Sequence, residues 1–175
     1  QVERAGAAGI VPHFASELEF FLFKDTYSAA RKKNYHDLEL SQSYNEDYHV
    51  LSGGFAEPII GDIRRLVDAS GVPVESSKGE WAPGQHEINF RYSEALEMAD
   101  RAALFKHGCK EIAIQQDCSV TFMAKWHTDL AGSSAHLHVS LWDAEGRTNL
   151  FANGDGSSES ETFRHFLGGW MAHAR

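Results

Sequence analysis

The chain of 175 residues is 42% hydrophobic, which is enough for one globular domain with a sizeable core. Its 25 acidic residues outnumber its 16 basic ones, and a formal charge of −9 without a basic patch argues against nucleic acid or a membrane surface as a partner. Two cysteines cannot build a disulfide framework, and neither a signal peptide nor a membrane-length apolar run is visible, so we expect a cytoplasmic protein.

The first half of the chain alternates between strand and helix patterns. Residues 16–23, SELEFFLF, alternate with period two and predict a strand. Residues 24–50 are polar and weakly patterned, which indicates an excursion on the surface. Residues 57–71 carry apolar side chains at helical spacing and predict a helix, and residues 86–92, HEINFRY, predict a second strand.

A long helix is predicted next, over residues 93–116. Ser93 can act as its N-cap, because a serine hydroxyl accepts a hydrogen bond from the first turn. The residues expected to face inward are Leu96, Ala99 and Ala103.

Two further strands and a final helix complete the pattern. Residues 119–126 and 134–142 alternate as strands do, and Gly146 marks a turn after the second. Residues 161–175 predict an amphipathic helix. The fold class is therefore α+β, with a mostly antiparallel sheet and helices covering one face.

Four glutamates and a histidine fall at positions that could share one surface. Glu17 and Glu19 project from the same face of the first strand, while Glu80 and Glu87 bracket a Pro-Gly turn that can fold them together. His136 lies on the polar face of the strand over residues 134–142. Like charges gathered in this way are costly unless a cation lies between them.

Each pattern also has a plain structural interpretation, since Glu-x-Glu and His-x-His are common on the solvent side of a sheet. Against it, Glu17 and Glu19 share their face with Phe21 and Phe23, which a solvated face would not favour. Carboxylates with one histidine suit Mg²⁺ or Mn²⁺ better than zinc, and two such ions suit phosphoryl transfer. The sequence has no Gly-Lys-Ser phosphate loop, so a nucleotide would be held mainly through metals.

Four segments resemble, in order, motifs of the glutamine synthetase family, of the class I type and its relatives that join glutamate to other amines. They are ELEFFLF, VESSKGEWAPGQHEINFRY, TFMAK and GSSAHLHVSLWD. The resemblance runs over nearly the whole chain. It implies a catalytic domain built on a curved, mostly antiparallel sheet that forms half of a funnel-shaped active site.

The resemblance also implies roles for individual residues. Glu19, Glu80 and Glu87 would hold the metal nearer glutamate, and Glu17 and His136 the metal nearer the ATP phosphates.

Four more residues match positions at the nucleotide and substrate sites of the family. Glu75, His138 and Ser140 match residues of the ATP site. Gly132 matches a glycine whose backbone touches substrate glutamate.

The implied activity is an ATP-dependent ligation of glutamate to ammonia through a γ-glutamyl phosphate, with two Mg²⁺ or Mn²⁺ ions, in a homo-oligomer that is usually a dodecamer. Two departures bear on the acceptor: Ala131 replaces an asparagine, and residues 76–79, SSKG, replace a run of histidines. A γ-glutamyl ligase for a polyamine or another amine is therefore a second hypothesis. A catalytically silent metal-binding relative is a third.

The family pattern extends beyond these residues. We expect residues 1–175 to be the N-terminal portion of the catalytic domain, without the family's small N-terminal domain. The family's catalytic arginines and flap glutamate would lie beyond Arg175, so the 175 residues alone are expected to be inactive.

Overall fold

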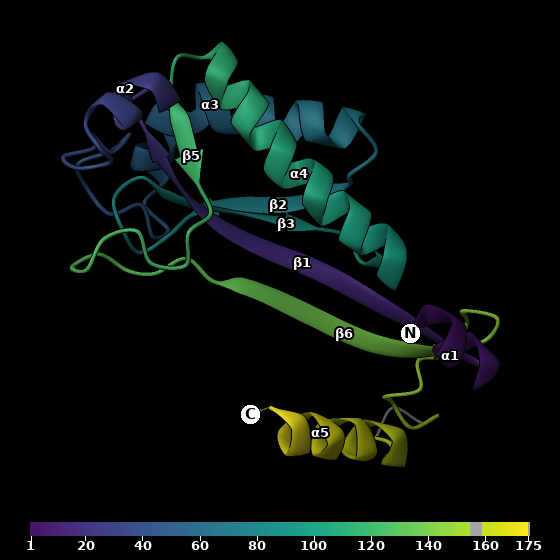
Figure 1. Ribbon diagram of the computed structural model, residues 1–175. Coiled ribbons are helices and arrows are strands. Elements are labelled where there is room, and N and C mark those ends of the chain that lie inside the picture. Colours follow the sequence, from purple (N-terminus) through teal and green to yellow (C-terminus); the bar gives the residue numbers. More distant parts are fainter. Residues whose placement is uncertain (155–158, 175) are drawn as a thin grey trace. The chain divides into compact units, whose positions relative to one another are not determined.

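The computed structural model describes residues 1–154 and 159–174, so Arg175, the last residue of the expected final helix, lies outside it. The described residues divide into two compact units. The larger comprises Ala15–Arg91 and Ala99–Leu137, and the rest forms the smaller. In chain order the elements are α1 (Val2–Ala7), β1 (Ile10–Phe23), α2 (Tyr27–Lys32), α3 (Val50–Ala69), β2 (Val74–Gly79), β3 (Gln85–Phe90), β4 (Ser93–Glu94), α4 (Ala95–Gln115), β5 (Ser119–Thr121), β6 (Ala135–Asp143) and α5 (Glu161–His173) (Figure 1).

The larger unit is built on antiparallel pairing around β1. Strand β3 pairs with β1, and β2 pairs with β3, which gives the order β2-β3-β1. Strands β5 and β6 also pair with β1. Mixed helix and antiparallel sheet confirm the predicted α+β class.

One face of this sheet is apolar and is covered by α3 and α4 (Figure 1). Phe105 of α4 packs edge-on against Phe20 at 6.3 Å and Phe90 at 4.6 Å between ring centroids. Leu18 and Ile88, which are register partners, are buried on the same face. Each such side chain stabilises the fold by about 1.5 to 3 kcal/mol.

The start and the rotation of α4 differ from the sequence prediction. Ser93 does not cap the helix, because it lies in β4 and the helix begins two residues later. Leu96 is 64% exposed, and Ala99 and Ala103 are exposed too. The residues that α4 buries are Met98, Phe105, Cys109, Ile112 and Ala113. Phe105 has more apolar surface to bury than Ala99 or Ala103, and it packs against Phe20 and Phe90, so it fixes the side of the helix that faces the sheet.

Other elements differ mainly in their bounds. Strand β1 begins at Ile10 and α3 at Val50, both earlier than predicted, while β5 ends at Thr121. Strand β2, VESSKG, was not predicted, because it has no apolar alternation and exists through its pairing with β3. The turn at Gly146 and the helix α5 follow the prediction.

A second, smaller core lies at the end of β1, on the face opposite α4. Phe21, Phe23 and Ala82 are buried there, and Trp126 packs edge-on against both phenylalanines. The segment over residues 24–50, predicted as a surface excursion, contributes Leu38 and Leu40 to this core. This explains how the face that carries Glu17 and Glu19 ends in two buried phenylalanines.

The smaller unit has its own aromatic contacts. Tyr92 and Trp142 stack with 6.3 Å between ring centroids, and His13 lies against both rings. Helix α5 is capped by Ser160, whose hydroxyl accepts a hydrogen bond from the Phe163 N–H at 3.0 Å.

Within the part of the chain that the structure describes, no helix combines the length and apolar character needed to cross a membrane.

The turn between β2 and β3 is anchored from outside the sheet by Glu46. A side chain on Gly79 would meet the Glu46 Cβ at 2.4 Å, so only glycine allows this approach. The Glu46 carboxylate is fully buried, 3.4 Å from His86 Nε2. Burial raises the pKa of Glu46 to about 7, although the Gly84 N–H lowers it, and burial lowers the pKa of His86 to about 4.

We expect Glu46→Gln to change stability in a pH-dependent way. Because the folded-state pKa of Glu46 is raised from 4.5 to about 7, its contribution to stability is complete below pH 4.5 and is lost as the pH rises through 7. The neutral amide does not titrate over that range, so the free energy of unfolding of the variant should exceed that of wild type by roughly 3 kcal/mol at pH 8 and match it near pH 4.

The measurement is urea unfolding in EDTA at several pH values between 4 and 8. If the difference in unfolding free energy between the variant and wild type does not vary with pH, the raised pKa of Glu46 is contradicted.

Candidate metal centre

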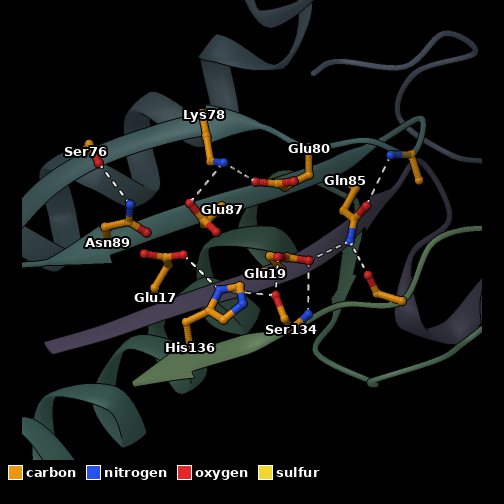
Figure 2. A network of polar contacts seen from close by, with 12 residues as sticks. Glu17, Glu19, Ser76, Lys78, Glu80, Gln85, Glu87, Asn89, Ser134 and His136 are labelled. Atoms are coloured by element: carbon orange, nitrogen blue, oxygen red, sulfur yellow. Dashed lines mark hydrogen bonds and ion pairs between the residues drawn. The ribbon is translucent and has the colours of Figure 1, made fainter. Parts of the chain in front are cut away.

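A row of charged side chains crosses three strands on the open face of the larger unit (Figure 2). Glu19 of β1 lies directly opposite Glu87 of β3, and Glu87 lies opposite Lys78 of β2. Because alternate residues of a strand share a face, the register alone puts these three side chains together. Directly opposed like charges destabilise a sheet, so Glu19 and Glu87 require a compensating cation.

A second row lies one step along the same face. Glu17 is opposite Asn89, whose amide donates to Ser76 Oγ at 3.1 Å. His136, from β6, comes within 2.9 Å of Glu17 Oε1 through its Nδ1. A carboxylate oxygen accepts, so His136 Nδ1 is the donor in this contact.

The five predicted acid and histidine positions form two overlapping triads. Glu19, Glu80 and Glu87 offer oxygens that all lie within 4.8 Å of one another, and so do the ligand atoms of Glu17, Glu87 and His136. Glu87 belongs to both. The family resemblance implies Glu87 for one ion and Glu17 with His136 for the other. That Glu87 reaches both groups follows from the strand register, which the sequence alone does not give.

Glu19 is held in place by neighbouring donors. Gln85 Nε2 donates to its Oε2 at 3.0 Å, and the Ser134 N–H donates to the same oxygen at 3.0 Å. The Ser134 hydroxyl donates to Oε1. Gln85 is almost fully buried and also donates to the Gly132 carbonyl at 2.8 Å. Neither Gln85 nor Ser134 was singled out from the sequence, although a glutamine directly after the Pro-Gly turn of an acidic segment is a usable signal.

Glu87 has the environment of a carboxylate that needs a cation. It is 2% exposed, and its Oε1 has no hydrogen-bond partner among the described residues. Burial first, and then the Glu17 charge, raise the pKa of Glu87, while Lys78 lowers it. A buried oxygen without a donor, facing two other carboxylates, fits a divalent ion.

The ammonium group of Lys78 is the cation that lies beside the carboxylates of Glu80 and Glu87 in this structure. Its Nζ lies 2.7 Å from Glu80 Oε1 and 3.6 Å from Glu87 Oε1. The contact with Glu80 is the largest of the effects that raise the pKa of the Lys78 ammonium above its usual range. The sequence indicated Lys78 only as a departure from a family motif, and its partners follow from the register.

The remaining predicted residues do not join the triads. Glu75 is exposed on β2, in a groove whose other lining residues include Arg64, Arg65 and Asp68. The Gly132 carbonyl is taken by Gln85.

The other two predicted ATP-site residues, His138 and Ser140, belong to the smaller unit. Ser140 Oγ accepts a hydrogen bond from Trp142 Nε1 at 2.9 Å.

Comparison with known proteins identifies the family. Residues 1–175 match the family model described as glutamine synthetase, catalytic domain. The chain is 47% identical to the γ-glutamylethanolamide synthetase GlnA4 of Streptomyces coelicolor over 100% of its length, and 35% identical to the glutamate–isopropylamine ligase of a Pseudomonas species over 99%. Its structure is similar to that of a GmaS/ADP complex, with a TM-score of 0.83 at 30% identity, over 99% of this chain and 39% of that one.

The chain therefore belongs to the glutamine synthetase family, as the four sequence segments predicted. It spans 37% of the length of the Streptomyces relative and 38% of the Pseudomonas relative.

We expect Gln85→Leu to weaken Mn²⁺ binding about tenfold, because the Glu19 carboxylate would lose a donor that orients it and partners of ligands typically contribute 10- to 100-fold. The measurement is a Mn²⁺ titration. Gln115→Leu, on the exposed side of α4, is the matched control and should bind as wild type does. Unchanged Mn²⁺ affinity in a folded Gln85 variant would show that this amide does not position Glu19.

Proposed function

We propose that the protein is an ATP-dependent ligase that joins the γ-carboxylate of glutamate to an amine nitrogen through a γ-glutamyl phosphate. The observation that carries this proposal is the pair of triads that share Glu87. Family membership supports the same reaction class. Two cations a few ångströms apart are an arrangement suited to phosphoryl transfer.

Oxygen ligands with one histidine favour Mg²⁺ or Mn²⁺ as the ions. Glu19, Glu80 and Glu87 would hold one ion, and Glu17 and His136, together with Glu87, would hold the other. When bound, the ions neutralise the negative charge on the transferred phosphoryl group. The protein's part is to orient the carboxylates, which Gln85 and Ser134 do for Glu19, and to exclude water around the buried Glu87.

ATP and glutamate would be bound by other residues. Glu75, His138 and Ser140 are assigned to ATP and Gly132 to glutamate, on the strength of the family motif. Since the chain spans 37% of the length of one relative, we take residues 1–175 as the N-terminal part of the catalytic domain, completed by groups outside them. A cytoplasmic homo-oligomer, with twelve subunits in the usual family form, is part of the same proposal.

Ammonia is the acceptor of glutamine synthetase itself, but a larger amine is a second candidate with an observation in its favour. Both relatives described above are named for amine acceptors, ethanolamine and isopropylamine. The two departures from the family motif, Ala131 and the segment over residues 76–79, also favour an acceptor other than ammonia. Ala131 packs against the second core, and Lys78 lies among the carboxylates.

The test is a ligase assay of the full-length protein with glutamate, ATP and Mg²⁺, and ammonia, ethanolamine, isopropylamine or a polyamine as the acceptor. We expect an acceptor-dependent γ-glutamyl amide together with inorganic phosphate, and at least a hundredfold loss of turnover in Glu87→Ala, because removing one group that stabilises transition-state charge costs about that much. Product with ammonia alone selects the first acceptor, and product with larger amines selects the second. No product with any amine would support the silent metal-binding relative and overturn the proposal.

A further inference from the structure

We propose that Lys78 is a built-in counter-ion that occupies the three-carboxylate triad when no metal is bound and competes with the divalent ion for it. This inference rests on the proposed function, since it concerns the same metal site. It adds a residue that sets the affinity of the site for its ion.

The strand register places the lysine at the site independently of side-chain conformation. Lys78 is the β2 partner of Glu87, and Glu87 is the β3 partner of Glu19, so all three project from the same face. A lysine at this position can reach the triad, whereas residues one position before or after it on β2 would point to the other face. The position is therefore built into the sheet.

The contacts of the ammonium group overlap those that a metal would make. Nζ lies 2.7 Å from Glu80 Oε1 and 3.6 Å from Glu87 Oε1, and both residues supply oxygens to the triad. A divalent ion ligated by the same oxygens would lie within a few ångströms of Nζ. Two cations that close repel each other, so the lysine must withdraw when the ion binds.

The surroundings of Lys78 allow this withdrawal. Its side chain is 36% exposed, so the ammonium can turn towards water. The ammonium already lies over the ring of Tyr48, with Nζ 5.4 Å from the ring centroid, and this contact does not depend on the carboxylates. Glu87, in contrast, is buried and cannot turn to solvent. Of the two, the lysine is therefore the side chain that can move away from the site, and Glu87 is the one that stays.

The proposal predicts opposite effects of one substitution on stability and on metal binding. Lys78→Met removes the counter-ion, so without metal the carboxylates repel one another and the melting temperature in EDTA should fall. The same variant should bind Mn²⁺ about three- to tenfold more tightly, because the ion no longer displaces a charge. A lysine that only supported the fold would lower the melting temperature without improving Mn²⁺ affinity.

The experiment measures the melting temperature in EDTA and the dissociation constant of Mn²⁺, read from the free-ion signal in electron paramagnetic resonance. Lys110→Met, on the exposed surface of α4, removes the same charge at a distance and should change Mn²⁺ affinity less than twofold. If Lys78→Met does not fold, Lys78→Gln replaces it, because glutamine keeps a hydrogen-bond donor near Glu80 without the charge. Lys78→Gln should also bind Mn²⁺ more tightly than wild type.

Equal or weaker Mn²⁺ binding by the Lys78 variants, with wild type binding normally, would overturn this inference and leave the proposed function intact. Failure of wild type and variants alike to bind Mn²⁺ would overturn the metal centre itself, and the inference with it.

Discussion

The repulsion between Glu19 and Glu87 is the constraint on which the site depends. Antiparallel pairing of β1 and β3 sets these carboxylates opposite each other, and Glu17 and Glu80 add two more on the same face. Burial of Glu87 removes the water that would screen the charges. A sheet that keeps such a row must hold a cation there, which ties the stability of the fold to the occupancy of the site.

The rest of the larger unit keeps this row rigid. On one face, Phe20 and Phe90 pack against Phe105 of α4, so the strands that carry the acids cannot shift in register without exposing a core. Glu46 approaches Gly79 and supports the turn between Glu80 and Glu87. Gln85 joins that turn to Glu19. The carboxylates are thus positioned by packing, and the cation completes the charge balance.

The sequence predicted most of the strands and the residues of the candidate metal centre, and what it did not predict has physical causes. Alternation along residues 16–23 and 134–142 located the strands, the faces of Glu17 and Glu19, and the position of His136. Strand β2 was missed because its residues, VESSKG, lack an apolar face. The predicted rotation of α4 was wrong because periodicity does not weigh the size of Phe105 against that of Ala99 and Ala103. The double role of Glu87 and the contacts of Lys78 depend on which residues face each other across strands, and that pairing is a long-range property.

The central claim is that one buried glutamate serves two cation sites, and the stoichiometry of Mn²⁺ binding tests it most directly. Glu87→Ala is compared with wild type and with Glu111→Ala, whose side chain is 61% exposed on α4. If Glu87 serves both sites, wild type and Glu111→Ala bind two ions per chain, and Glu87→Ala loses tight binding at both. Two ions bound by Glu87→Ala with wild-type affinity would contradict the account.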